Sequence, residues 1–373
     1  MKPIVRAGRM KPVHSDIRGP LFVEAMKRQK QGIDILKLNT GNPATFGFGL
    51  PDSIKNALIE HMQDGVGYCD FKGMPQARQA ICDYETSKGI KGITSDDVFI
   101  GNGVSEVVSF ALTPLLNDGD EVLVPSPSYS LWGNSVYLED GKPVFYTCDE
   151  QANWYPDIQD IRSKITDKTK AIVIINPNNP TGVLYPKELL LEIIQIARES
   201  GLLIFADEIY DRLVMDGKQH ISLASLTEDV PVITLNGLSK SHCLCGYRCG
   251  WMVISGPREL TEDYRQGIIQ LTSLRLCANT LAQIVIPAAL DDMDTPASMV
   301  RPGGRIYEQR EATVRELEKI DGLSFVKNDA AFYVFPKLDV KKFNITNDKQ
   351  FAHDLLDATN ILLVPGSGFD WKD

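Results

Sequence analysis

Short, continuously apolar segments recur along the middle of the chain, and they constrain its fold more than any other feature. Their apolar residues are mostly β-branched or aromatic, and they occupy residues 121–124, 144–146, 171–175, 202–205, 232–235 and 250–254. Helical periodicity, clearest over residues 187–200, lies between them. Strands that are apolar on both faces and alternate with helices are typical of a mostly parallel sheet covered by helices on both sides. The sequence therefore predicts an α/β fold with a large central sheet.

The pattern changes near residue 287, which indicates a second and smaller domain. Acidic, proline and glycine residues interrupt the chain there, and a charged helical pattern follows over residues 307–319. Further strands are expected at residues 323–326, 331–335 and 361–364, around a helix at 349–358. We therefore predict a large domain over 51–286 and a small α+β domain over 287–373. Residues 1–50, with a short strand expected at 33–38, form an arm and part of the small domain.

Composition excludes several classes of partner. The 373 residues carry a formal charge of -10 with a pI near 5.1, which argues against nucleic acid or an anionic membrane as the main partner. No apolar run approaches the roughly 20 residues of a membrane span. The first residues lead into charged sequence rather than an apolar signal core. We therefore expect a cytoplasmic protein.

The cysteines favour reduced thiols over a disulfide framework, because there are seven of them and they are widely scattered. Cys243, Cys245 and Cys249 lie close together beside His242, so a metal site was weighed. Their spacing matches no recognised zinc pattern, and we predict no metal.

Lys240 follows the apolar strand 232–235, where loops gather polar groups over an α/β sheet. A lysine held beside a second cation such as Arg248 is easier to deprotonate and can form a Schiff base with an aldehyde. Arginine also presents a planar fork that matches a phosphate. The pair suggests an aldehyde cofactor with a phosphate, which describes pyridoxal phosphate. The alternative is two solvated cations in a surface loop.

A glycine-rich turn at residues 101–103 leads from a short strand at 97–100 into a helix that begins near Val104 and Ser105. Free backbone N–H groups and the positive end of the helix dipole make such a turn a seat for phosphate. Turns of this kind are common, so the motif has weight only in combination with Arg248.

Three more side chains follow successive predicted strands. Tyr129 offers a ring able to lie against a flat heterocycle, and Asn179 can donate to a ring oxygen. Asp207 is a carboxylate placed to keep a pyridine nitrogen protonated. Each has a structural alternative, because prolines around the first two stiffen turns and acids at strand ends cap helices. Their occurrence together, in order, favours the cofactor interpretation.

With these residues in hand, the chain resembles the class I pyridoxal-phosphate-dependent aminotransferases of fold type I. Within that family the likeness is greatest to bacterial glutamate–pyruvate (alanine) aminotransferases, and it covers essentially the whole chain. The motifs that carry it are Asp16-Ile17-Arg18-Gly19-Pro20, Asn39 with Gly41-Asn42-Pro43, Gly67-Tyr68-Cys69-Asp70, Gly101-Asn102-Gly103-Val104-Ser105-Glu106, residues 176–182, residues 207–210, residues 236–240 and Leu276-Cys277-Ala278-Asn279.

The resemblance implies roles for particular residues. Lys240 would bind the cofactor covalently and shuttle a proton, Asp207 would pair with the ring nitrogen, and Tyr210 would hold the phenolic oxygen. The other residues implied in cofactor binding are Gly103, Val104, Ser105, Tyr129, Asn179, Ser239, Arg248 and, from the neighbouring subunit, Tyr68. Those implied in substrate binding are Gly41, Asn179 and Arg18.

The resemblance also implies a reaction and an assembly. An amino group would move between an L-amino acid, most simply L-alanine, and 2-oxoglutarate, giving pyruvate and L-glutamate by ping-pong chemistry. The enzyme would be a homodimer with shared active sites.

The chain departs from the family pattern in two places. It ends at Asp373, just before the position of the arginine that grips the substrate carboxylate, so we expect a small domain without its C-terminal end. Ser15 stands where relatives often have tyrosine. Two alternatives therefore stay open, a cofactor-binding paralogue with weak or no transaminase activity, and a pyridoxal-phosphate lyase on the same fold.

Overall fold

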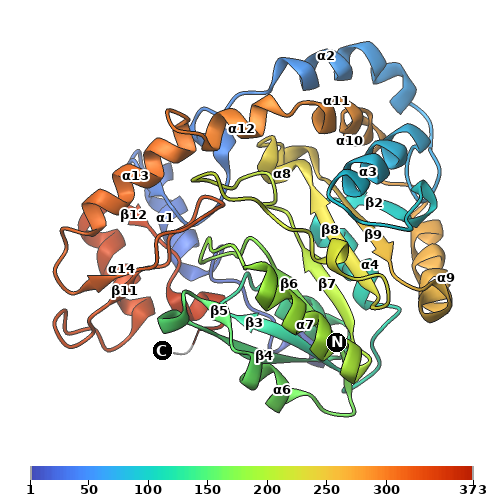
Figure 1. The fold of residues 1–373 in the computed structure, drawn as a ribbon. Coiled ribbons are helices and arrows are strands. Elements are labelled where there is room, and N and C mark those ends of the chain that lie inside the picture. The colour runs from blue at the N-terminus through green and yellow to red at the C-terminus, as the bar shows by residue number, and fades with distance from the viewer. Residues whose placement is uncertain (1, 372–373) are drawn as a thin grey trace.

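The computed structural model describes residues 2–371, and an eight-stranded sheet forms its centre (Figure 1). The strands lie in the order β2-β9-β8-β7-β6-β3-β4-β5. Their bounds are β2 Val98–Asn102, β3 Glu121–Ser126, β4 Lys142–Asp149, β5 Tyr155–Pro156, β6 Thr169–Ile175, β7 Leu203–Asp207, β8 Val232–Gly237 and β9 Cys249–Ser255. The five central strands from β8 to β4 run parallel, whereas β9 is antiparallel to both of its neighbours and β5 is antiparallel to β4. The predicted α/β fold with a mostly parallel sheet is confirmed.

Helices cover both faces of this sheet because each central strand is apolar on both sides. Along β6, Ile172 and Ile174 pack in one core with α6 (Ile158–Lys164) and α7 (Lys187–Ser200). Ala171, Val173 and Ile175 point the other way, into a core shared with α4 (Val104–Leu112), α5 (Leu131–Leu138) and α9 (Arg258–Arg275). The alternation of strand side chains thus produces a three-layer arrangement.

A third core covers the β2–β9 edge of the sheet. It packs α2 (Asp52–His61) and α3 (Pro75–Ser87) with α10 (Thr280–Ile284) and α11 (Ile286–Asp291), at the top of Figure 1. The fully buried Trp251 of β9 belongs to it. Segments from both halves of the sequence therefore close this edge.

The N-terminal segment lies beside the C-terminal one. In β1 (Leu36–Lys37) the backbone pairs in parallel with β12 (Ile361–Leu362), and α1 (Pro20–Lys30) packs on α14 (Asp348–Thr359) in a small apolar core. A second two-stranded ladder joins β10 (Leu323–Ser324) to β11 (Lys337–Leu338). The helices α12 (Asp294–Val300) and α13 (Arg305–Leu317) lead from the sheet to this region (Figure 1).

Four predicted strands differ in the structure, and those expected at 323–326 and 361–364 are shortened to β10 and β12. The strand expected at 33–38 is reduced to β1, and residues 331–335 form no strand. Ala331 has a φ of 60°, a left-handed conformation that turns the chain and prevents a ladder there. The aromatic residues that follow pack their rings on Tyr210 instead.

The division at residues 50 and 286 stays a prediction, and Met1 and residues 372–373 of the predicted domains lie outside the described part. Within residues 2–371, none of the helices combines the length and the apolar character that crossing a bilayer requires.

Candidate active site

The carboxyl ends of three parallel strands meet at one place in the sheet and carry the predicted polar residues there. The backbone register sets Asp207 at the end of β7 opposite Ile175 of β6 and Leu235 of β8. The chain then continues from β6 into the turn with Asn179, and from β8 into the short helix α8 (Leu238–Ser241) with Lys240. Strand alignment thus brings together residues that are far apart in the sequence.

Asp207 is a buried carboxylate held by neutral donors. Its residue is 5% exposed, and Trp132 Nε1 donates to its Oδ2 at 3.0 Å. The backbone N–H of Ile209 reaches Oδ1 at 3.4 Å. Burial raises the pKa of Asp207 to about 6, and the Trp132 hydrogen bond opposes that rise. Within residues 2–371, no lysine or arginine forms an ion pair with this carboxylate.

Tyr210, three residues further on, meets a second tyrosine. Its hydroxyl lies 2.8 Å from the Tyr333 hydroxyl, and Asn179 Nδ2 is 3.5 Å away. Tyr210 is only 2% exposed, and this burial raises its pKa well above the ordinary value of 10. The phenol is therefore protonated at neutral pH and can act as a hydrogen-bond donor.

Lys240 directs its amine at the predicted substrate-pocket glycine. Its Nζ donates to the backbone carbonyl of Gly41 at 2.9 Å. Burial lowers the pKa of Lys240, but the neighbouring Tyr333 and Cys245 raise it, and the net shift is upward. The expectation that Arg248 would lower this pKa is wrong for the chain as described, because the arginine fork points elsewhere.

Arg248 instead lies against the glycine-rich turn at residues 101–103. Its Nη2 donates to Ser105 Oγ at 3.1 Å and to the carbonyl of Asn102 at 3.4 Å. Gly103 has a φ of 85°, which L side chains rarely adopt, and a β-carbon there would lie 2.3 Å from Arg248 Nη2 unless the arginine tip moved. The first intrahelical donor of α4 is Glu106, so the backbone N–H groups of Val104 and Ser105 stand free of the helix ladder.

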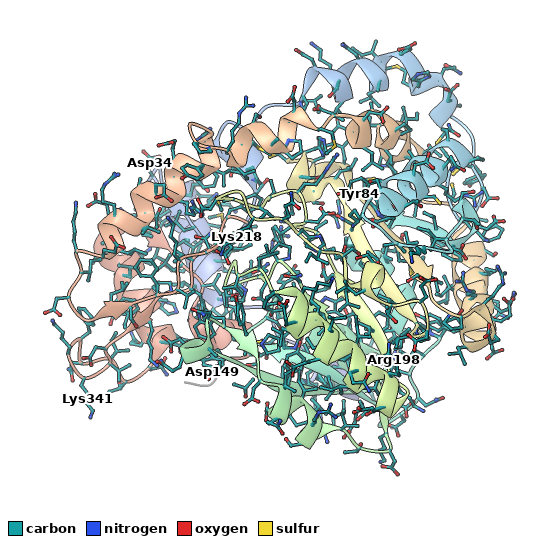
Figure 2. All side chains as sticks on the ribbon, in the orientation of Figure 1. Asp34, Tyr84, Asp149, Arg198, Lys218 and Lys341 are labelled. Atoms are coloured by element: carbon teal, nitrogen blue, oxygen red, sulfur yellow. The ribbon has the colours of Figure 1, made fainter. Side chains whose placement is uncertain are left out.

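A buried ion cluster holds the ends of β7 and β8 in place. Lys88 Nζ lies 2.9 Å from Glu208 and 3.1 Å from Asp211. Tyr84, labelled in Figure 2, donates to Asp211 at 2.7 Å, and so does Asn236 Nδ2 from β8. The cluster ties the residue after Asp207 to the strand that leads to Lys240. The cluster therefore fixes the spacing of the strand ends that carry Asp207 and Lys240.

One group of side chains in the described part of the chain has metal-binding spacing, formed by Glu208, Asp211 and His220. The Lys88 ammonium lies between the two carboxylates, and they hold its pKa well above the ordinary value despite burial. The position that a metal ion would take is thus occupied by the Lys88 ammonium. The three thiols between residues 243 and 249 form no such group.

The remaining predicted residues differ in how close they lie to this centre, and Tyr129 is near enough to raise the pKa of both Lys240 and Tyr210. Tyr129 is 38% exposed and is held through its backbone N–H, which donates to the Asn179 carbonyl at 3.0 Å. Ser239 is partly buried, and its carbonyl accepts from the Cys245 thiol. Arg18 lies exposed in the turn before α1, and within residues 2–371 it forms no hydrogen bond or ion pair. Tyr68 is 83% exposed beside a cavity of about 590 Å³.

Sequence reasoning missed two residues of the centre, Trp132 and Tyr333. Trp132 lies three positions after Tyr129, on the helix that follows the predicted ring-stacking turn, and an indole N–H needs a partner when buried. That signal was available. No sequence signal pointed to Tyr333, because residues 331–335 were predicted to form a strand of the small domain.

Comparison with known proteins identifies the family. The family model described as aminotransferase class I and II matches residues 33–372. The glutamate-pyruvate aminotransferase AlaA of Haemophilus influenzae is 50% identical over 371 residues, which cover 100% of this chain and 92% of the relative.

Solved structures agree with this match. The crystal structure of an aminotransferase from Escherichia coli has a TM-score of 0.97 at 48% identity and covers 99% of this chain and 92% of that one. An alanine aminotransferase from Pyrococcus furiosus has a TM-score of 0.92 at 41% identity, with 98% and 92% covered. The resemblance inferred from the motifs is confirmed. The chain belongs to the class I and II aminotransferase family.

Proposed function

We propose that this protein is a pyridoxal-phosphate-dependent aminotransferase that moves an amino group from L-alanine to 2-oxoglutarate, giving pyruvate and L-glutamate, and the reverse. The observation that carries the proposal is a buried carboxylate, Asp207, without a cation partner in the described chain, one strand away from the lysine-bearing helix α8. The choice of substrates rests on relatives named as glutamate-pyruvate and alanine aminotransferases, which match this chain along its whole length.

The ring end of the cofactor fits the buried residues. Desolvation makes the Asp207 anion unfavourable, as its raised pKa indicates, and a protonated pyridine nitrogen would supply the missing positive charge. Tyr210 and Asn179 carry donors for the phenolic oxygen, and Tyr129 offers an aromatic face. The donor set therefore matches a flat, polar heterocycle.

The phosphate end fits the exposed turn. Two free backbone N–H groups at the start of α4, the Ser105 hydroxyl and the Arg248 fork form a cradle of donors. Gly103 leaves room for the Arg248 guanidinium beside the backbone, which a side chain at 103 would displace. We include Ser239, which precedes Lys240 in α8, in this end of the site.

When bound, pyridoxal phosphate supplies an amine-reactive aldehyde and a ring that accepts the electron pair left by loss of the amino acid's α-proton. The chain's own residues move the proton. Lys240 is the general base that takes it and the acid that returns it, and the Gly41 carbonyl gives the free amine a defined position. Asp207 would stabilise positive charge on the ring nitrogen, and Tyr210 would donate to the phenolic oxygen. Arg18, Gly41 and Asn179 line the substrate side.

A homodimer with shared sites completes the proposal. Exposed apolar side chains gather around the cavity beside Tyr68, where Val66 is 76% exposed, Leu276 52% and Leu281 44%. Such a patch is typical of an interface between subunits. Tyr68 would then reach the phosphate held by the partner subunit. We also keep a cytoplasmic location as part of the proposal, in line with seven cysteines that are all free thiols.

The test measures pyruvate and glutamate formed from L-alanine and 2-oxoglutarate by the cofactor-loaded protein. We expect equal amounts of the two products, and a loss of rate of about 10³-fold or more in Lys240→Ala. Lys91→Ala is the matched control, because Lys91 is an exposed lysine paired with Glu228 far from the site. It should keep full activity.

Two outcomes would contradict the proposal. Pyruvate or another product formed without a 2-oxo acid acceptor would indicate a lyase. A protein that binds the cofactor but converts no common amino acid would be the weakly active paralogue.

A further inference from the structure

Tyr333 joins three parts of the site that come from separate regions of the chain. Its hydroxyl lies 2.8 Å from that of Tyr210. A β-carbon added to Gly41 would lie 2.2 Å from the same Tyr333 oxygen, so a side chain at 41 would displace that hydroxyl. Gly41 in turn accepts a hydrogen bond from Lys240 through its carbonyl. The Tyr333 hydroxyl therefore contacts Tyr210, which is one proton donor, and Gly41, whose carbonyl accepts from the other donor, Lys240.

The Tyr333 ring is held independently of its hydroxyl. It packs edge-on against Tyr210, with ring centroids 5.7 Å apart, and against Phe332 at 5.6 Å. Phe332 also packs on Tyr210, at 5.8 Å. The three rings form a mutually supporting cluster. A phenylalanine at 333 would keep these contacts and remove only the oxygen.

The hydrogen-bonding capacity of Tyr210 gives the hydroxyl of Tyr333 a specific role. A tyrosine oxygen donates one proton and accepts up to two. The Asn179 amide nitrogen can only donate to it, and when Tyr333 donates as well, both acceptor positions are filled. The Tyr210 proton is then free to point at a ligand. If Tyr210 donated to Tyr333 instead, it would have no proton for that ligand.

We propose that Tyr333 is a positioning residue, which aims the Tyr210 hydroxyl at the phenolic oxygen of the cofactor and sets the Gly41 carbonyl against Lys240. The inference rests on the proposed function. It also explains the glycine at 41. The backbone there has no left-handed requirement, and it is the Tyr333 hydroxyl that occupies the space of a side chain.

The experiment combines Tyr333→Phe, Gly41→Ala and the double variant in the cofactor-loaded protein. The first measurement is a pH titration of the visible absorption band of the bound cofactor. In Tyr333→Phe the band should titrate about half a pH unit or more higher, because the phenolate oxygen loses a well-aimed donor. The value of kcat should fall about threefold to tenfold with little change in KM. Tyr307→Phe, a tyrosine stacked on Arg310 instead, is the control and should leave the band unchanged.

The double variant tests the packing of Gly41. Gly41→Ala should lower the melting temperature of the cofactor-free protein and weaken cofactor binding by about tenfold or more, because backbone or ring must move. With Phe at 333 the nearest ring carbon is 3.1 Å from the added methyl group, so the same change should do less harm. We therefore expect the losses of melting temperature and of cofactor affinity in the double variant to be smaller than the sums of the single losses.

The outcomes separate this inference from the proposed function. A wild-type protein without any visible band would overturn the proposed function. A normal wild-type band that is unchanged by Tyr333→Phe, or additive effects in the double variant, would overturn the role of Tyr333 alone.

Discussion

The two ends of the proposed cofactor site are built in opposite ways. At the ring end, Asp207 and Tyr210 are at most 5% exposed, and each is held by a side chain from elsewhere in the chain. At the phosphate end, Arg248 is exposed and contacts a turn whose donors are mainly backbone groups. Burial therefore governs one end, and exposed charge with backbone geometry governs the other.

At the ring end, function and stability make opposite demands on the same carboxylate. A buried carboxylate is unfavourable in the chain without its ligand, and it becomes useful when a cation arrives. An exposed arginine costs the fold little, because water solvates it in either case. Removing the Asp207 charge should therefore stabilise the cofactor-free fold and lower activity, whereas removing the Arg248 charge should change cofactor binding alone.

The largest effect is expected for Asp207→Asn. Activity should fall about 10²- to 10³-fold, because the charge that supports a protonated ring is lost. The free energy of unfolding of the cofactor-free protein should instead rise at neutral pH. The folded pKa of about 6 lies above the ordinary 3.8, so the wild type is favoured below pH 4 and loses stability as the pH rises through 6. An asparagine at 207 does not titrate, so the variant does not lose stability in this way as the pH rises.

Urea unfolding of the two cofactor-free proteins at pH 4.5 and pH 7.5 measures this. The free energy of unfolding of the variant should rise by about 2 kcal/mol relative to the wild type between these two pH values. An equal difference in free energy of unfolding between variant and wild type at both pH values would show that burial does not destabilise the carboxylate. The two ends of the site would then not differ in the way described.

A smaller effect is expected for Arg248→Gln, at the exposed end. Cofactor affinity should fall about 10- to 100-fold, the loss typical of one or two hydrogen bonds to a charged group. The melting temperature of the cofactor-free protein should not change. Equilibrium binding at low and high salt gives the check, because the wild type should lose affinity with added salt more steeply than the variant.

Arg258→Gln serves as its control, since Arg258 pairs with Glu262 on the surface of α9 and should affect neither quantity. A drop in melting temperature in Arg248→Gln would mean that this end also supports the fold.

The smallest effect is expected for Trp132→Phe. Phenylalanine keeps an aromatic contact with Phe205, whose ring lies 5.3 Å from the indole, but it removes the donor to Asp207. Because that hydrogen bond lowers the pKa of Asp207, the pKa should rise by about one further unit. The pH dependence of stability would move upward by the same amount. An unchanged profile would mean that burial alone sets this pKa.

Much of the fold followed from local pattern. The apolar runs that became β6, β7 and β8 are buried on both faces, and α7 spans the predicted residues 187–200, because such patterns are stable in few other arrangements. Residues 331–335 were predicted wrongly. Their apolar and aromatic side chains suit a strand, but the left-handed turn at Ala331 depends on contacts with distant residues.

Local sequence pattern was enough to predict that Asn179, Asp207 and Lys240 follow strand ends, because strand position and polarity are local properties of the chain. What those side chains contact depends on tertiary packing. Trp132 and Tyr333 reach the site from positions 75 and 123 residues away from their partners. A hydrogen bond over such a separation depends on how the layers and the small domain pack, and no local pattern encodes that distance.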